Sequence, residues 1–124
     1  MKFIKQYEDA IKNQVASLKD EGINGTMFWA YRNSKDAGCD DLNFYETIWE
    51  RDIEYIVETC RANEIKQITI SSSFSGMPEV LWEFCKLGCK VVGMKQVPSN
   101  YEEWDWEEQK KLRRLVPAVI LKIN

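Results

Sequence analysis

The sequence contains no histidine among its 124 residues. Histidine is the commonest general base and the usual activator of a serine or cysteine nucleophile. Its absence excludes serine–histidine and cysteine–histidine catalytic pairs. Serine–lysine and cysteine–aspartate pairs stay open, but no spacing points to either. We therefore assign no catalytic residue, and the sequence leans away from an enzyme.

Long apolar runs are also missing. The longest are only a few residues, whereas a helix needs about 20 apolar residues to span a bilayer. The first residues, Met1–Asp9, place polar side chains where a signal peptide needs its apolar stretch. We therefore expect no membrane partner and a cytoplasmic protein whose cysteines remain free thiols.

The four cysteines lack the spacing of a metal site. Only Cys85 and Cys89 are close, and structural zinc sites usually combine two tighter ligand pairs. Acidic residues between Asp40 and Glu58 could hold a divalent cation, but they are better interpreted as the solvated face of a helix and its leading loop. We expect no metal and no cofactor, and we predict the cysteines to be small buried apolar residues.

The charge balance disfavours nucleic acid. The formal net charge is −3 and the pI is about 5.1, whereas binding to a phosphate backbone relies on excess positive charge. The single basic cluster, Lys110–Arg114, is preceded by five acidic residues between 102 and 108. These acids would repel a nucleic-acid strand, so we expect no such partner.

Three aromatic residues, Tyr101, Trp104 and Trp106, lie in the same charged segment. Aromatic anchors dominate protein interfaces. These residues are therefore candidates for binding a protein partner or a second copy in a homodimer. The ordinary alternative is that one tryptophan packs inward and the other lies on the surface.

The length predicts one domain over residues 1–124. Apolar spacing and β-branched runs predict helices over 4–18, 25–35, 49–62 and 78–87, and strands over 68–70, 89–97 and 117–123. The first helix is expected to end by Gly22, and Asn24 is expected to cap the second. Residues 27–31 could instead form a buried strand, and residues 40–45 form either a loop or a short edge strand.

The segment 99–115 is predicted to be a further helix. Ser99 and Glu102 have the spacing of a reciprocal helix cap. Acidic residues precede basic ones, an order that complements the helix dipole. Pro117 then closes the segment.

These elements predict an α/β fold, with a small mixed sheet and three to four packing helices. A βαβ unit is expected over residues 66–97, with a right-handed crossover. The strand at 117–123 is added to this unit. Its direction depends on the excursion over 98–116.

Residues Ile65–Ile70, the helix end Lys86–Gly88 and the strand carrying Val91, Val92 and Gly93 resemble the C-terminal half of the GNAT acyltransferase fold. The resemblance covers roughly residues 49–124 and implies an antiparallel last strand. The segments Phe44–Trp49 and Ile70–Gly76 are similar to a group of uncharacterised bacterial proteins classed as a domain of unknown function. That likeness implies a fold and no activity.

The sequence departs from the GNAT pattern where the cofactor binds. Those enzymes hold the acyl-CoA pyrophosphate on backbone N–H groups of a glycine-rich turn at a helix N-terminus. The corresponding stretch here, Phe44–Trp49, contains no glycine and carries Glu46. Bulky side chains block close approach to the backbone, and the carboxylate repels a phosphate, so acyl transfer is disfavoured.

The loop after the strand at 68–70 is the best candidate for a ligand site. It joins the C-terminal end of a strand to a helix N-terminus, where open α/β sheets commonly bind ligands. It lacks the P-loop lysine and the dinucleotide glycine spacing. Its residues could equally cap the helix and shape the turn. The candidate ligand-binding residues are Ser71, Ser72, Ser73, Ser75 and Gly76.

We therefore predict a small non-catalytic protein that serves as a protein-interaction or regulatory module. The alternative is a small-molecule binder that takes phosphate, a nucleotide or acyl-CoA, or a degenerate GNAT-like acyltransferase.

Overall fold

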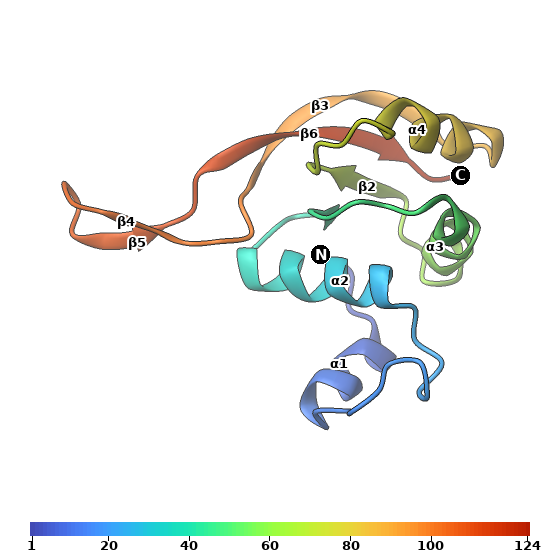
Figure 1. Cartoon of the computed structure of the whole chain (residues 1–124), viewed down its shortest axis with the longest axis horizontal. Coiled ribbons are helices and arrows are strands. Elements are labelled where there is room, and N and C mark those ends of the chain that lie inside the picture. The colour runs from blue at the N-terminus through green and yellow to red at the C-terminus, as the bar shows by residue number, and fades with distance from the viewer.

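The computed structural model describes all 124 residues, with four helices and six strands. The helices are α1 (Lys5–Lys12), α2 (Gly25–Ala37), α3 (Glu50–Ala62) and α4 (Met77–Lys86). The strands are β1 (Leu42–Phe44), β2 (Gln67–Ile70), β3 (Lys90–Pro98), β4 (Glu103–Asp105), β5 (Lys110–Leu112) and β6 (Leu115–Lys122). Figure 1 shows a four-stranded sheet, its helices, and a two-stranded arm that extends away from the sheet. The predicted α/β class with a mixed sheet is confirmed.

The strand order of the main sheet is β1-β2-β6-β3. β1 and β2 are parallel neighbours joined through α3, which makes β1–α3–β2 the compact βαβ unit. β6 runs antiparallel to both β2 and β3 and lies between them. The unit expected over 66–97 therefore has two parallel strands, but the last strand is inserted between them rather than added beside them. The antiparallel direction expected for the last strand is confirmed.

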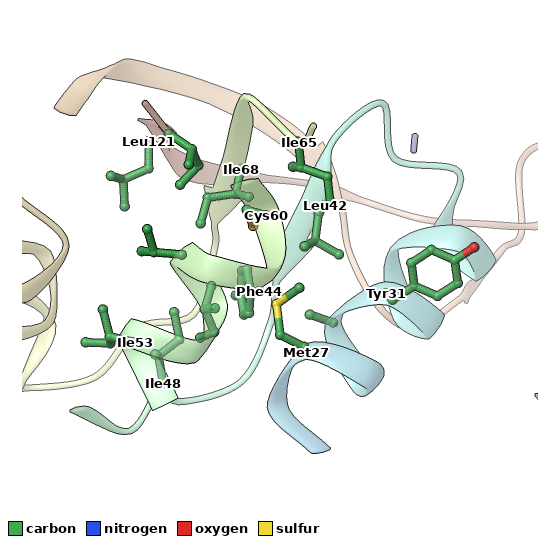
Figure 2. Packing of buried hydrophobic residues seen from close by; sticks show 14 of the residues in the cluster. Met27, Tyr31, Leu42, Phe44, Ile48, Ile53, Cys60, Ile65, Ile68 and Leu121 are labelled. Carbon is green, nitrogen blue, oxygen red and sulfur yellow. The ribbon is translucent and has the colours of Figure 1, made fainter. Parts of the chain in front are cut away.

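One hydrophobic core holds the molecule together (Figure 2). Met27 from α2, Phe44 from β1 and Ile53 from α3 meet there with Ile68 of β2 and Leu121 of β6. Alternate residues of the two parallel strands, Leu42 and Phe44 of β1 and Ile68 and Ile70 of β2, face this core. The core thus includes residues from both ends of the chain, Ile4 and Ile123.

The cysteines follow the prediction for small apolar residues. Cys39, Cys60 and Cys89 are buried, Cys85 is partly buried, and all four are free thiols. Burial, with a smaller effect of the neighbouring Cys89, raises the pKa of the Cys60 thiol to about 12. A buried thiol with so high a pKa stays protonated and unreactive.

The second helix forms as its local signals predict. The Asn24 side chain accepts a hydrogen bond from the Met27 backbone N–H at 3.0 Å, which is the predicted N-cap. Gly38 ends the helix with a φ of 75°, the left-handed conformation that glycine adopts without strain. Residues 27–31 therefore lie in a helix, and the strand alternative is wrong. Residues 42–44 form a short edge strand, so of the two alternatives for residues 40–45, loop or edge strand, the strand is correct.

The first helix is shorter than predicted. α1 ends at Lys12, and Gln14 adopts a φ of 49° instead of continuing the helix. Val15 and Leu18 still pack against the core, but from a loop. Their spacing therefore correctly predicted burial and wrongly predicted helix. An apolar side chain can be buried from a helix or from a loop, as long as neighbouring elements contact it. None of the helices, the longest of which have 13 residues, has the length and apolarity that crossing a membrane demands.

The helix predicted over 99–115 is wrong, because β4 and β5 form an antiparallel hairpin there. At the tip, the Asp105 carboxylate accepts hydrogen bonds from the N–H groups of Glu107 and Glu108 at 2.9 and 3.2 Å. Such a local bond stabilises a turn rather than a helix.

Ion pairs then cross the hairpin. Glu102 pairs with Arg113, and Glu103 with Arg114. The order of acidic then basic residues, which resembled complementarity to a helix dipole, instead places opposite charges on facing strands. Ser99 does not cap a helix. Its N–H donates to the Arg114 carbonyl at 2.8 Å and joins the two strands where the hairpin begins.

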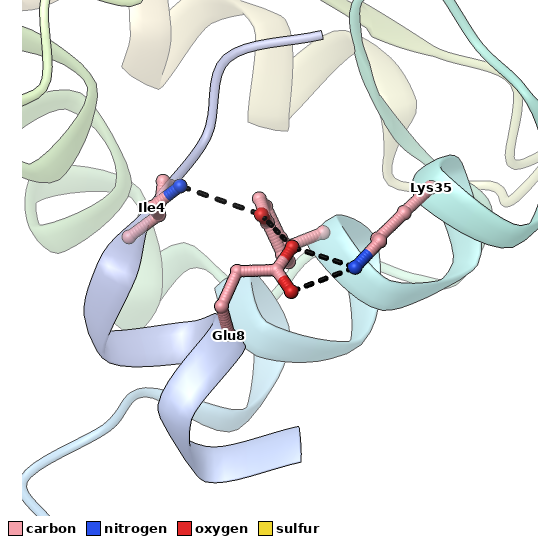
Figure 3. Close-up of polar contacts among 4 residues, drawn as sticks. Ile4, Glu8 and Lys35 are labelled. Carbon is pink, nitrogen blue, oxygen red and sulfur yellow. Dashed lines mark hydrogen bonds and ion pairs between the residues drawn. The ribbon is translucent and has the colours of Figure 1, made fainter. Parts of the chain in front are cut away.

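A hydrogen-bond network fixes α1 against α2 (Figure 3). The Tyr31 hydroxyl donates to Glu8 at 2.5 Å and accepts from the Ile4 N–H at 3.3 Å. Lys35 donates to both Glu8 carboxylate oxygens, at 2.8 and 2.7 Å. The bonds from Lys35 and Tyr31 hold the pKa of Glu8 below its ordinary value. The network therefore joins α1 to α2 beside the core contacts of Tyr7 and Ala10.

Two neighbouring tyrosines in this region differ in one respect. Both Tyr7 and Tyr31 are buried, and their ring centroids lie 5.4 Å apart in an edge-to-face contact. The Tyr31 hydroxyl has two partners, whereas the buried Tyr7 hydroxyl has none. A buried polar group without a partner costs about 1–3 kcal/mol, because it has lost its water.

Tyr7→Phe is therefore expected to leave stability unchanged or raise it by up to about 1 kcal/mol, since the ring is kept and only the unpaired hydroxyl is removed. Tyr31→Phe, the matched change, should lower the free energy of unfolding by about 1–3 kcal/mol. Urea denaturation of both variants measures the difference. A larger loss for Tyr7→Phe than for Tyr31→Phe would show that the Tyr7 hydroxyl has a partner.

Candidate functional site

The aromatic residues predicted to bind a partner lie together on the arm, which we define as residues 99–114. Tyr101, Trp104 and Trp106 are 56%, 48% and 82% exposed. The two indole rings are in edge-to-face contact, with centroids 5.9 Å apart. The alternative in which one tryptophan packs into the core is therefore wrong. Figure 1 shows that the arm, which carries these residues, extends well beyond the sheet.

The base of the arm is held in a defined position. The Tyr45 hydroxyl donates to the Pro98 carbonyl at 2.6 Å, which links the end of β1 to the end of β3. Arg113 donates to the Ser99 carbonyl at 3.0 Å, across the two strands where they leave the sheet. Burial and the neighbouring Cys39 thiol raise the pKa of Tyr45, so its hydroxyl keeps the proton that this bond needs. The arm therefore leaves the sheet at a fixed base.

The two edges of the main sheet differ, because one is covered by a helix and the other is open. At the β1 edge, the Ser34 hydroxyl of α2 donates to the Asn43 carbonyl at 3.0 Å and accepts from the Asn43 N–H at 2.8 Å. Helix α2 thus covers that edge and satisfies its backbone groups. The β3 edge has no neighbouring strand. An open edge presents unpaired N–H and C=O groups to any strand that approaches.

The open edge is also apolar. Val91, Val92 and Met94 of β3 are 47%, 53% and 65% exposed. A bulge between Val91 and Gly93 interrupts the first part of the strand, and Pro98, which has no N–H, closes the other end. These features leave Gly93–Val97 as the regular part of the edge. β3 then continues directly into the arm, which carries the exposed aromatic residues.

The serine loop lies beside the end of β1. The N–H groups of Ser71 and Ser72 both donate to the Phe44 carbonyl, at 3.0 and 3.2 Å. The Ser71 hydroxyl accepts from the Asn43 side chain at 2.9 Å. Two backbone donors that an anion would need are therefore already used within the protein.

The remaining loop residues are dispersed. The Ser72 hydroxyl is buried without a partner, whereas Ser73 and Ser75 are exposed. Gly76 precedes α4 and provides no side-chain cap. Of the five predicted residues, Ser71 and Ser72 thus have backbone donors that are used within the protein, whereas Ser73 and Ser75 lie at the surface.

A cleft that sequence reasoning missed lies between the N-terminal ends of α2 and α3. Its volume is about 380 Å³. Trp29 of α2 and Trp49, which precedes α3, line it and are 44% and 57% exposed. These tryptophans were read as parts of helices, because each lies in a periodic segment. Their partial exposure depends on how the two helices meet, which no local pattern records.

No three side chains of the acidic, cysteine and histidine types gather where they could hold a metal ion. Asp52 lines the cleft, and its carboxylate accepts hydrogen bonds from two neutral donors. Asn24 donates to one of its carboxylate oxygens at 3.1 Å and Thr26 to the other at 2.9 Å. The polar groups of this region are thus organised by hydrogen bonds between the two helices.

Comparison with protein families finds one match. A family model described as "Domain of unknown function (DUF7698)" matches residues 26–122. It covers α2 and every element that follows, including the arm and both edges of the sheet. No curated protein and no solved structure matches the chain.

Proposed function

The chain belongs to the DUF7698 family of domains of unknown function, and from this premise we propose that it is a non-catalytic interaction module in which two copies pair through β3 and the arm. The observation that carries the proposal is the asymmetry of the sheet. One edge is covered by α2, whereas the other is open, carries exposed apolar side chains and leads along the chain into the arm with its exposed aromatic residues.

Strand addition explains the open edge. Two β3 strands related by a two-fold axis would run antiparallel, and each would satisfy the unpaired backbone groups of the other. The pairing would also cover Val92 and Met94 in both copies. Lys95 does not oppose it, because its ammonium group is paired with Asp41 at 3.3 Å. A contact of this kind is self-complementary, as a two-fold dimer requires.

The arm supports the same arrangement. A two-stranded hairpin alone is marginally stable in water, so a partner surface that covers the arm would stabilise it. At its tip, Glu107 and Glu108 make no ion pair, and neither do Lys110 and Lys111. In the antiparallel pairing of two β3 strands, the two arms leave at opposite ends of the dimer, so each arm extends past the start of β3 in the other copy.

Met94→Lys tests the edge. Lysine is a residue that natural edge strands use against pairing, and Met94 is the most exposed apolar side chain of β3. We expect the unaltered protein to be a dimer in sedimentation velocity and Met94→Lys to be a monomer with an unchanged circular dichroism spectrum. Phe3→Lys, at an exposed apolar residue far along the chain, should remain a dimer. A monomeric unaltered protein, or a dimeric Met94→Lys, would contradict the proposal.

The arm is tested separately by the double change Trp104→Ala and Trp106→Ala. Truncating interface aromatics costs about 2 kcal/mol or more, so the dimer dissociation constant should rise by roughly thirtyfold. The core should be unaffected, because both rings are exposed. An unchanged dissociation constant would show that the arm is not part of the interface and that only the β3 edge could form it.

Acyl-CoA or phosphate binding at the serine loop receives less support from the geometry. The Phe44 carbonyl already occupies the N–H groups of Ser71 and Ser72. The turn over 44–49 that would face a diphosphate contains Glu46 and no glycine. A small-molecule role is better supported at a different place, the cleft between α2 and α3.

A further inference from the structure

We propose that the cleft between the N-terminal ends of α2 and α3 binds a neutral carbohydrate, which stacks on Trp29 or Trp49. This inference is independent of the proposed dimer, because the cleft adjoins the covered β1 edge and not the open β3 edge. At about 380 Å³, the cleft lies within the usual size range of small-molecule sites.

The place of the cleft in the fold is favourable. It lies where β1 ends at Phe44 and the chain turns through residues 45–49 into α3. β1 and β2 are the parallel pair of the sheet. In open α/β sheets, ligands bind in the crevice outside the carboxyl ends of the strands. The cleft therefore occupies the position that this architecture commonly uses.

The walls supply aromatic surfaces. Trp29 and Trp49 come from separate elements and both line the cleft. The Arg32 guanidinium lies over the Trp29 ring, 5.6 Å from its centroid, and Arg51 lies over the Trp49 ring at 5.7 Å. Each cation–π contact restricts its indole and leaves the ring partly exposed. A partly exposed, oriented indole can bury the apolar C–H face of a sugar ring.

The polar groups of the cleft fall into two sets. Asn24, Thr26 and Asp52 bond to one another and join the two helices, so they form a rigid base. The side chains of Asn33, Glu46, Thr47 and Arg51 have no hydrogen-bond or ion-pair partner within the protein. The second set offers an amide, a carboxylate, a hydroxyl and a guanidinium to a ligand. Sugar hydroxyls, which both donate and accept, can use all four.

The charges decide between ligand classes. Glu46 and Asp52 contribute two carboxylates to the lining, and Arg51 contributes one cation. This balance repels phosphate and therefore disfavours nucleotides, although a base could stack on indole. A strongly cationic ligand would be repelled by the guanidinium of Arg51. A neutral, hydroxyl-rich ring avoids both penalties and matches the free donors and acceptors.

The test uses the unaltered protein and named probes. Glucose, galactose, N-acetylglucosamine, maltose and cellobiose are titrated while tryptophan fluorescence and ligand-observed NMR are recorded, with adenosine and inorganic phosphate as the competing classes. We expect at least one sugar to bind saturably and phosphate not to bind. Absence of saturation with every sugar, or saturation by adenosine or phosphate alone, would overturn the proposal.

Variants locate the binding. Trp29→Ala and Trp49→Ala are tested separately, and at least one should weaken sugar binding about tenfold, the usual scale for removal of a stacking aromatic. Glu46→Gln should also weaken it, whereas at a phosphate site the same change would strengthen binding. Trp82→Ala is the matched control, because Trp82 is exposed on α4 and does not line the cleft. An equal loss with Trp82→Ala would place the sugar elsewhere, and Met94→Lys should leave sugar binding unchanged whatever the outcome for the dimer.

Discussion

Phe84→Ala is expected to lower the free energy of unfolding by about 3–5 kcal/mol, the usual cost of truncating a fully buried phenylalanine. Phe84 lies on α4, is completely buried, and belongs to the single core of the molecule. The change removes the transfer free energy of the ring and leaves a cavity that the surrounding elements fill only in part. Small domains are stable by about 5–15 kcal/mol in all, so the variant should be close to unfolding.

Urea denaturation followed by circular dichroism measures this loss. Trp82→Ala is the control, since Trp82 lies on the same helix but is exposed. A surface change of this kind should shift stability by no more than about 0.5 kcal/mol. Similar losses in the two variants would mean that α4 does not present Phe84 to the core.

Asn43→Ala should have the second largest effect, a loss of about 2–4 kcal/mol. Asn43 lies on β1 and is completely buried. Its side chain accepts a hydrogen bond from the Thr69 hydroxyl at 2.7 Å and donates to the Ser71 hydroxyl at 2.9 Å. Alanine removes both bonds and leaves the buried Thr69 hydroxyl without a partner. The free energy of unfolding therefore falls by the cost of an unpaired buried group in addition to the lost bonds.

A double variant separates these contributions. Thr69→Val in the Asn43→Ala background removes the orphaned hydroxyl and should restore part of the stability, which urea denaturation would show. Asn13→Ala is the matched asparagine control, because Asn13 is exposed and its side chain makes no hydrogen bond. If the double variant were less stable than Asn43→Ala, the Thr69 hydroxyl would have another partner.

The elements that were predictable from the sequence are those with local signals. The cap at Asn24 and the left-handed Gly38 delimit α2 within the chain itself. The periodic apolar face of α3 and the proline in the first turn of α4 are equally local. Each depends on residues within a few positions of one another. These helices are therefore found where the sequence places them.

The segment 99–115 shows where local signals mislead. Its cap spacing and charge order fit a helix, yet the same residues form a hairpin whose acidic and basic residues pair across the strands. The deciding contact is the bond from Ser99 to Arg114, which extends the ladder of β3 and β6 into the arm. A contact between residues fifteen positions apart cannot be read from helical spacing, which compares residues only three or four positions apart.

The candidate sites divide in the same way. Tyr101, Trp104 and Trp106 were singled out as aromatics in a charged setting, and the structure exposes all three on the arm and brings the two indole rings into contact. The serine loop was singled out by its place after a strand, and the N–H groups of Ser71 and Ser72 are used internally. The cleft lined by Trp29 and Trp49 escaped notice. The two residues lie twenty positions apart and line one cleft where Asp52 joins the starts of α2 and α3.

The sequence by itself determined the lack of histidine chemistry, the α/β class and the helices that carry their own caps and apolar faces. Only the tertiary structure decided that β6 lies between β2 and β3, that one sheet edge is covered and the other open, and that two tryptophans flank one cleft. The physical reason is the range of the interactions. Helix periodicity and capping act within one or two turns, whereas strand order and cleft walls depend on contacts between residues that only folding brings together.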